Sequence, residues 1–372
     1  MLSLSAVIAA AFGVGLAFGI GFPLTSLTLE AWNEPKWLIG LAGAAPALAV
    51  LMMLPFLPAV VGRVGAVPAI ASGCLIAALG FLALSFVSSA PAWIALRFAM
   101  SAGIALPWLV GETWINTVST DGTRGRVIAL YAIAFFTGFA IGPQLIGILG
   151  KGMLPFIAGA AATALAGVPI VLARRLAPDL THDAPVGARA AWRLAPIGMI
   201  GGFIGGFAEI SYLSLLPNVA LASGTSETDA LRLLTMLSVG GGVLQFPIGW
   251  LADTFNKTTI SLALAAAFVV LSLLLPWSLR EPAIALAMAF VLGGVILGFY
   301  TVGLSIIGDQ VSMKDIASAN AAFLIMYQAG AILGPLASGA AMTVEPVTGF
   351  IATVSCLMIA SAIALKVFAK QR

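Results

Sequence analysis

The stretch GFAIGPQLIG, residues 138 to 147, places a Gly-Pro pair in the middle of a long apolar run. Nearly the same pattern, GAILGPLASG, returns at residues 330 to 339, which is a spacing of 330 − 138 = 192 residues. The matching positions are Gly138, Gly142, Pro143 and Gly147 in the first stretch and Gly330, Gly334, Pro335 and Gly339 in the second. A repeat of this kind predicts that the chain is built from two related halves.

The composition places both stretches in a membrane. Of 372 residues, 61% are hydrophobic and only 8% are charged, and the mean hydropathy is +1.11. A soluble domain with this composition would not stay in solution. We therefore expect an integral membrane protein surrounded by the lipid bilayer. The basic residues are dispersed among short loops, so the pI near 9.0 indicates topology and not nucleic-acid binding.

Apolar segments of about 20 residues, each long enough to cross a hydrocarbon core of about 30 Å as a helix, recur along the chain. The first is longer than the core of a signal peptide, and we expect it to be retained. The sequence thus predicts an all-α membrane protein with twelve transmembrane helices, at residues 4–29, 37–61, 66–87, 91–116, 126–149, 153–174, 194–221, 229–252, 258–278, 282–307, 317–340 and 346–367.

One longer polar segment, residues 174 to 193, separates the sixth span from the seventh. We predict an N-terminal six-helix bundle of residues 1–174, a cytoplasmic linker of residues 175–193 and a C-terminal six-helix bundle of residues 194–372. Two pseudo-symmetric bundles, repeated in parallel about an axis along the membrane normal, are found in alternating-access transporters. We expect the protein to act as a monomer.

The loops on the two sides of the membrane differ in Lys and Arg content, which sets orientation. With an even number of spans, both termini share one side. That side carries Arg63, Arg124, Arg126, Arg174, Arg175, Arg189, Arg193, Lys257, Lys314, Lys366, Lys370 and Arg372, against Lys36, Lys151, Arg232 and Arg280 on the other. We therefore predict a multi-pass protein of the cell inner membrane with both termini in the cytoplasm.

The whole chain resembles the major facilitator superfamily. Gly138-x3-Gly142-Pro143-x3-Gly147 is similar to its motif C, which is associated with proton-driven antiporters of the drug-efflux branch. Independently of the resemblance, glycines four residues apart let a partner helix approach closely, and Pro143 removes one helix hydrogen bond and bends the helix. Matched bends in the fifth and eleventh spans would shape the contact between the bundles. Small-residue packing without a role in transport is the alternative.

A second resemblance lies in the loop between the eighth and ninth spans. GWLADTFNK, residues 249 to 257, is similar to motif A of the superfamily, with Asp253 and Lys257 at the expected places. Its first-half counterpart, residues 58 to 66, keeps Arg63 but has Gly62 where the motif has Asp. The second half therefore carries the more complete motif.

The resemblance implies that the motif A loop latches the inner side. Its Asp253 would meet the positive N-terminal end of the fifth span, beside Arg124 and Arg126. A solvated loop carboxylate without a partner is the alternative for Asp253.

LRFAMSAGIALPW, residues 96 to 108, resembles motif B, with Arg97 and Gly103 as the matching positions. An arginine inside a span costs about 2.5 to 3.5 kcal/mol on insertion scales, so it usually faces a cavity or a partner. The resemblance implies a role for Arg97 in proton movement or in binding an anionic group of a substrate. Because Arg97 lies close to the outer end of its span, snorkelling to the interface is the alternative.

Glu112 lies further along the same span, toward its cytoplasmic end. There it could pair with Arg63 or Arg126. A structural or gating ion pair is favoured over contact with a substrate, because a carboxylate near the interface stays wet at little cost.

Glu209 follows a glycine-rich run near the middle of the seventh span, with no basic residue nearby in sequence. A carboxyl group at mid-membrane must face water, pair, or take up a proton. This makes Glu209 the leading candidate for proton coupling, with a neutral hydrogen-bonded core residue and direct substrate binding as alternatives. Further residues that could line a cavity are Trp108, Tyr212, Gln245, Tyr300 and Gln328.

Several kinds of chemistry have no basis in this sequence. It contains no G-x4-G-K-[ST] phosphate loop, and its one histidine, His182, lies in the predicted linker. Cys74 and Cys356 lie within spans, where small buried hydrophobes are favoured over disulfide or metal binding. We therefore expect no enzyme activity, no cofactor and no metal, and an ion gradient as the energy source.

The sequence thus predicts a secondary transporter that works by alternating access, exchanging a small organic, mostly apolar or neutral solute for protons. Efflux by antiport is favoured because of the helix-five motif. A proton-coupled importer of a nutrient or siderophore-like compound is an alternative within the class. A receptor or assembly factor built on a transporter frame is the alternative from another class.

Overall fold

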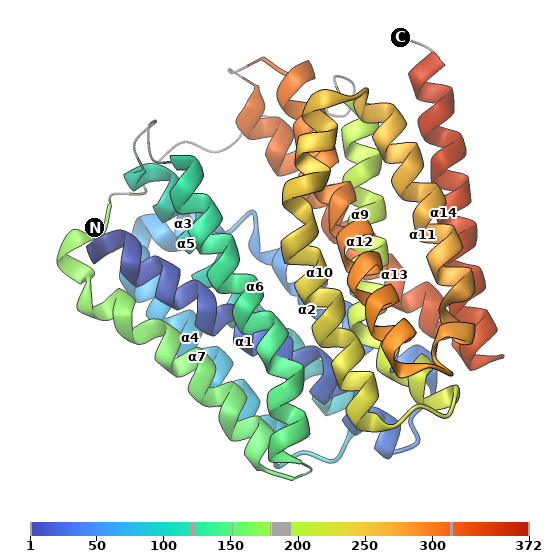
Figure 1. Cartoon of the computed structure of the whole chain (residues 1–372). Coiled ribbons are helices and arrows are strands. Elements are labelled where there is room, and N and C mark those ends of the chain that lie inside the picture. The colour runs from blue at the N-terminus through green and yellow to red at the C-terminus, as the bar shows by residue number, and fades with distance from the viewer. Residues whose placement is uncertain are drawn as a thin grey trace. The chain divides into compact units, whose positions relative to one another are not determined.

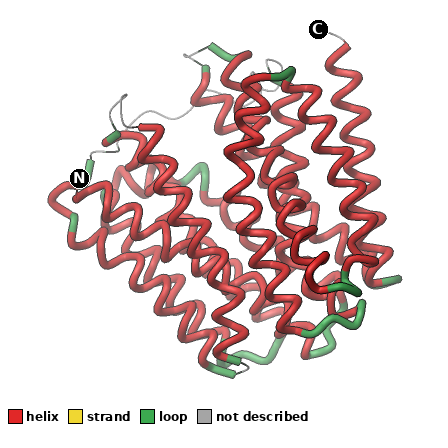
Figure 2. The backbone as a smooth tube through the Cα atoms, viewed as in Figure 1, coloured by secondary structure: helices red, strands yellow, loops and turns green. Residues whose placement is uncertain are grey.

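The computed structural model describes residues 2–119, 124–150, 152–178, 180, 195–312 and 315–370. Throughout these residues the secondary structure is helical, with short connecting loops (Figures 1 and 2). The helices are α1 (Leu2–Ala31), α2 (Lys36–Met53), α3 (Leu57–Val64), α4 (Ala66–Leu84), α5 (Ala90–Val118), α6 (Arg124–Leu149), α7 (Leu154–Leu172), the 3-10 turn η1 (Arg174–Leu176), α9 (Pro196–Ala222), α10 (Glu227–Thr254), α11 (Lys257–Ser278), α12 (Pro282–Gln310), α13 (Ile316–Met342) and α14 (Pro346–Lys370).

Among the described residues, twelve helices are long and apolar enough to cross a membrane. They are α1, α2, α4 to α7 and α9 to α14, and each corresponds to one predicted span. The predicted all-α fold with twelve spans is confirmed, because a bilayer forces each apolar segment to satisfy its backbone hydrogen bonds internally as a helix.

The second span is shorter than its prediction of residues 37–61. Helix α2 ends at Met53, and the short helix α3 begins at Leu57. Pro55 has no N–H to continue the helical ladder, and it also disfavours helical backbone at the preceding residue. Pro58 then lies in the first turn of α3, where a missing N–H costs nothing. An apolar run therefore continues across a helix break that hydropathy does not detect.

The contacts divide the chain into two compact units. Unit 1 comprises Met1–Leu24 and Leu48–Ala184, and unit 2 comprises Thr25–Ala47 and Pro185–Arg372. The end of α1 and the start of α2 thus group with the second half of the chain. The predicted bundles of residues 1–174 and 194–372 keep α1 and α2 whole, and that division stays a prediction.

In unit 1, the first Gly-Pro motif holds α6 against α1. A Cβ atom added at Gly138 would lie 2.2 Å from the carbonyl oxygen of Phe12, and one at Gly142 would lie 2.3 Å from the carbonyl carbon of Gly19. Gly15 does the same from α1, because its Cβ would lie 2.0 Å from the carbonyl oxygen of Phe135. The two backbones therefore touch where one helix presents a glycine to a backbone carbonyl group of the other.

In unit 2, the second motif holds α13 against α9 in the same way. A Cβ atom at Gly330 would lie 2.0 Å from the carbonyl oxygen of Phe203, and one at Gly334 would lie 2.4 Å from that of Phe207. Each motif therefore packs its helix against the first long helix of its own unit. The repeat in the sequence is a repeat in packing.

The second motif also contacts α2. A Cβ atom at Gly40 would lie 2.1 Å from the carbonyl oxygen of Pro335, and one at Gly339 would lie 2.5 Å from that of Lys36. Both contacts lie inside unit 2. In unit 1, Pro143 is buried and Gly147 is exposed. A role for the two bends in the contact between the bundles stays a prediction.

The backbone contacts predict which glycines tolerate a methyl group. Gly142→Ala and Gly330→Ala should each lower the free energy of unfolding by about 1 to 3 kcal/mol, because the new Cβ meets rigid backbone. Gly308→Ala is the matched control, since a Cβ at this helical glycine meets nothing within 4 Å. Thermal unfolding of the purified variants in one detergent measures the difference. Equal melting temperatures for all three variants would contradict the packing described here.

Candidate functional site

Glu209 lies at the middle of α9 and is half-buried. Its Oε2 accepts a hydrogen bond from the hydroxyl of Tyr327 on α13, with 2.6 Å between the oxygens. Within residues 195–312 and 315–370, no basic side chain forms an ion pair with it. The described partner of this membrane-embedded carboxyl group is therefore a phenol and not a cation.

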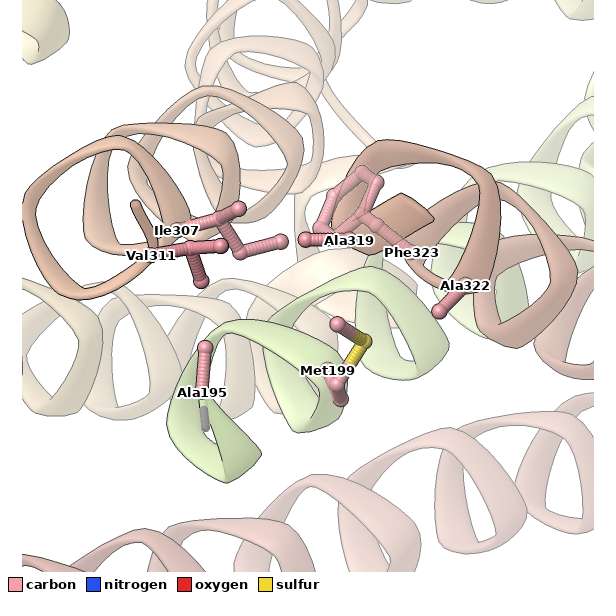
Figure 3. Close-up of a cluster of buried hydrophobic side chains, with 7 residues drawn as sticks. All are labelled: Ala195, Met199, Ile307, Val311, Ala319, Ala322 and Phe323. Carbon is pink, nitrogen blue, oxygen red and sulfur yellow. The ribbon is translucent and has the colours of Figure 1, made fainter. Parts of the chain in front are cut away.

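Aromatic rings continue from this hydrogen bond along α12 and α13. The ring of Tyr300 meets that of Tyr327 edge-on, with centroids 5.6 Å apart, and that of Phe323 likewise at 5.1 Å. Phe323 belongs to a buried cluster formed by α9, α12 and α13, in which it lies near Met199 and Ile307 (Figure 3). The carboxyl group of Glu209 thus adjoins an aromatic row anchored in the core.

The glycines that precede Glu209 explain how α13 comes so close. A Cβ atom at Gly206 would lie 2.0 Å from the carbonyl oxygen of Tyr327, and one at Gly202 would lie 2.9 Å from the ring of Phe323. Because α9 presents bare backbone here, α13 approaches until the Tyr327 hydroxyl reaches Glu209. The glycine-rich sequence of α9 therefore positions the hydrogen bond.

Arg97 lies in unit 1, where its side chain is only 1% exposed. The guanidinium carbon lies 5.3 Å from the centroid of the Phe22 ring, in a cation–π contact. Nε and Nη2 have no hydrogen-bond partner among the residues that the structure describes. Arg97 does not snorkel in this structure, and its cation is buried against α1 with unused donors.

Glu112, also in unit 1, accepts a hydrogen bond of 2.9 Å from the indole Nε1 of Trp108, one turn earlier on α5. The structure describes Arg63 and Arg126, and neither forms an ion pair with Glu112. The Trp108 ring in turn meets Phe18 of α1 edge-on at 6.0 Å. Trp108, which the sequence predicts to line a cavity, is thus the hydrogen-bond partner of Glu112, which it predicts to act in gating.

At the predicted latch, Lys257 begins α11 and forms an ion pair with Asp309 near the end of α12. Its Nζ also donates to the carbonyl oxygen of Ser305 at 3.2 Å. Asp253 is exposed in the last turn of α10, and Arg63 is exposed on α3. The side chain of Arg124 lies outside the described residues. Lys257 therefore joins two helices of one unit, through an acidic partner that the sequence analysis missed.

The remaining polar candidates lie in unit 2. Thr301 donates to Gln245 Oε1 at 2.9 Å, and Gln328 is buried. Tyr212 is 0% exposed and donates to Ser272 Oγ at 2.7 Å. Its ring packs edge-on against Phe350 with centroids 4.9 Å apart. Tyr212 therefore belongs to the packed core and does not line a cavity as predicted.

The sequence analysis also missed Tyr327. The repeat spacing offers the signal that could have found it, because 327 − 192 = 135 pairs Tyr327 with Phe135 and 209 − 192 = 17 pairs Glu209 with Ala17. Both polar positions have apolar counterparts in the first half. Comparing each residue with the one 192 positions away therefore picks out polar residues, such as Glu209 and Tyr327, at positions where the other half has an apolar residue.

The sequence model of the Major Facilitator Superfamily matches residues 4–218 and again residues 198–372. The chain belongs to this superfamily. This major facilitator protein is 26% identical over 333 residues to the uncharacterized MFS-type transporter YcaD of Salmonella enteritidis PT4, covering 89% of this chain and 86% of the relative. The YcaD protein of Escherichia fergusonii is 26% identical over 323 residues, covering 86% and 84%.

Solved structures of transporters share the fold of this major facilitator protein. The nucleoside transporter NupG superposes with a TM-score of 0.78 at 14% identity, covering 100% of this chain and 99% of NupG. A bacterial homolog of the human lysosomal transporter Spinster, in an inward-facing and unoccupied conformation, gives 0.75 at 14% identity, covering 98% and 94%. The chain is a multi-pass membrane transporter with twelve candidate spans among its described residues.

The core position of Tyr212 yields a prediction. Tyr212→Phe should lower the melting temperature, because it leaves the buried Ser272 hydroxyl without this partner, at a cost of about 1 to 3 kcal/mol. Adding Ser272→Ala should recover part of the loss, since it removes the stranded group. Transport should keep its KM in both variants. A raised KM without a change in melting temperature would instead indicate that Tyr212 contacts the substrate.

Proposed function

We propose that this transporter exports a small organic, mostly apolar or neutral solute across the cytoplasmic membrane by alternating access, in exchange for protons. The observation that carries the proposal is the hydrogen bond between Glu209 and Tyr327 in the middle of a span. Glu209 can gain or lose a proton, and the hydroxyl of Tyr327 can hydrogen-bond to it in either state. Glu209 also lies at the middle of α9, a membrane span.

The chemistry of this pair suits reversible proton binding. As a carboxylate, Glu209 accepts the hydrogen bond from the tyrosine hydroxyl. As a carboxylic acid, it can instead donate a hydrogen bond to the hydroxyl oxygen of Tyr327. An ionised carboxyl in hydrocarbon surroundings without a cation is costly, so its charge state depends on access to water. Alternating access to the two sides would thus load the proton on one side and release it on the other.

The surroundings of the pair support the proposed substrate class. Tyr327 bonds to the carboxyl, its ring meets that of Tyr300, and Tyr300 in turn meets Phe323. The spans of unit 2 add few other charged groups, so a multiply charged solute would lack counter-charges. An apolar or neutral organic solute loses little solvation on entering such surroundings.

Further assignments complete the proposal. The resemblance to motif C supports export, and the excess of Lys and Arg on the side of the termini supports cytoplasmic termini in the inner membrane. We infer that Arg97 acts in proton movement, as its resemblance to motif B implies and as its burial inside a span supports. We assign gating roles to Asp253, Lys257, Arg63, Glu112, Arg124 and Arg126. The protein would act as a monomer without cofactor or metal.

The proposal predicts the behaviour of Glu209→Gln. This variant should lose transport driven by a pH gradient by at least about tenfold, because an amide cannot exchange the coupling proton. Exchange of labelled for unlabelled solute without a gradient should continue. The solute is first found by a thermal-shift screen of neutral and lipophilic compounds, since ligands of the native state raise its melting temperature. Reconstituted vesicles with an imposed pH difference give both rates.

Two further variants sharpen this test. Tyr327→Phe should retain coupling but shift its pH dependence, because it removes a hydrogen bond to the carboxylate. Glu281→Gln is the control, because this exposed carboxyl at the start of α12 has no assigned role, and it should leave pH-driven transport within about twofold. Gradient-driven transport at the normal rate in Glu209→Gln would remove this residue from the coupling mechanism.

A further inference from the structure

The turn η1 carries two adjacent arginines, Arg174 and Arg175, directly after the end of α7. Both side chains are exposed. Among residues 2–119, 124–150 and 152–178, no carboxylate forms an ion pair with either of them. Two neighbouring cations are therefore left for a partner from outside this part of the chain.

Hydrogen bonds from two other helices hold η1 in place. Ser3 Oγ, at the start of α1, donates to the carbonyl oxygen of Leu176 at 3.3 Å. The same Oγ accepts a hydrogen bond of 2.8 Å from the indole Nε1 of Trp114, which is buried near the end of α5. The ends of α1, α5 and α7 thus meet at η1. The two arginines therefore lie at the end of unit 1 that holds the N-terminus.

An exposed apolar stripe on α7 leads to these arginines. Leu165, Val168 and Leu172 follow one another at spacings of three and four residues, so they share one face of the helix. All three are exposed, and Leu172 is 80% exposed. Because α7 is a candidate membrane span, this face meets acyl chains. Exposed Leu176 continues the apolar surface past the arginines. The guanidinium groups therefore lie where hydrocarbon gives way to headgroups.

The charges of unit 1 leave this end positive. Among its described residues, the carboxyl group is that of Glu112, which is engaged with Trp108. Three further acidic residues lie outside the described residues, namely Asp121, Asp179 and Asp183. An anion from outside the chain would therefore meet little repulsion from the described part of unit 1.

The repeat indicates that the second arginine is an addition. The spacing of 192 residues pairs Arg174 with Lys366, since 174 + 192 = 366, and Arg175 with Val367, since 175 + 192 = 367. The second half thus keeps one cation at this place and has an apolar residue at the other. A positive charge that orients the chain in the membrane needs no adjacent pair. The pair therefore suits a ligand that takes two guanidinium groups.

The phosphate of an anionic phospholipid fits this surface. Guanidinium groups bind phosphate oxygens through parallel N–H···O bonds, and cations near the membrane surface attract anionic lipids. A zwitterionic headgroup brings its own cation and gains less. A soluble phosphate ion would use the arginines but not the apolar stripe. The combination of stripe and arginine pair therefore favours a lipid over a soluble anion.

We propose that η1 and the adjoining face of α7 form a binding site for one anionic phospholipid. Its phosphate bonds to Arg174 and Arg175, and one acyl chain lies along Leu165, Val168 and Leu172. The hydrogen bonds of Ser3 hold the turn in position before the lipid arrives. The site involves neither Glu209 nor the solute, so it goes beyond the proposed transport function and stands or fails separately from it.

Native mass spectrometry of the delipidated full-length protein in detergent tests the site, with dioleoyl phosphatidylglycerol or dioleoyl phosphatidylcholine added in steps. Arg174→Gln with Arg175→Gln should weaken binding of the first phosphatidylglycerol at least about fivefold, because the charge-assisted contacts to phosphate are lost. Binding of phosphatidylcholine should stay within about twofold, since its headgroup gains less from the arginines. Arg280→Gln is the control, an exposed arginine followed in sequence by Glu281, and it should change neither affinity.

Two further variants separate lipid binding from membrane orientation and from phosphate binding. Arg174→Lys with Arg175→Lys keeps both charges, and hence the orientation signal, but should still weaken phosphatidylglycerol binding at least about twofold, because an ammonium group lacks the paired N–H geometry. Leu172→Gln should weaken it as well, since the acyl chain loses apolar contact. Equal phosphatidylglycerol binding with and without the arginines, an equal loss for both lipids, unchanged binding in Leu172→Gln, or competition by inorganic phosphate would each overturn the lipid site.

Discussion

Contact between bare helix backbones is the constraint on which this structure depends. Lipid tails are as apolar as leucine side chains, so burial alone gives membrane helices little reason to associate. Here α1 meets α6, and α9 meets α13, at glycines whose missing side chains let carbonyl oxygens of the partner approach to where a Cβ would stand. These contacts set the separation of the helices, and every side-chain interaction near them follows from that separation. The Glu209–Tyr327 hydrogen bond is one such interaction, because Gly206 brings the Tyr327 backbone against α9.

The same constraint governs how the segment Thr25–Ala47 packs within unit 2. Gly40 and Gly43 allow this segment to pack closely on α13 and α9, while the buried amide of Asn218 forms its hydrogen bonds with Ser26 and Glu30. A surface of this kind does not deform gradually, since a partial gap loses packing and strands polar groups at once.

The sequence predicted the spans well and their partners poorly, for a physical reason. Hydropathy reports that a segment must be helical in lipid, so all twelve spans were found, and only the break at Pro55 between α2 and α3 was missed. Which face of a helix meets which neighbour depends on distant segments. The glycine repeat was recognised, but its partners on α1 and α9 were not foreseen. Likewise Glu209 was a candidate from its isolation in sequence, whereas Tyr327 and Asp309 lie 118 and 52 residues from the groups they contact.

Ser26 and Asn218 are 192 residues apart, so each is hydrogen-bonded to its own counterpart in the duplication. A hydrogen bond has a direction, with one donor and one acceptor, and two identical subunits would have to place the same residue on both sides of such a pair. Covalent fusion of the halves removes that restriction, because each copy can then mutate alone. A single fused chain can therefore form a serine–asparagine hydrogen bond at this position, whereas a symmetric dimer of identical halves cannot.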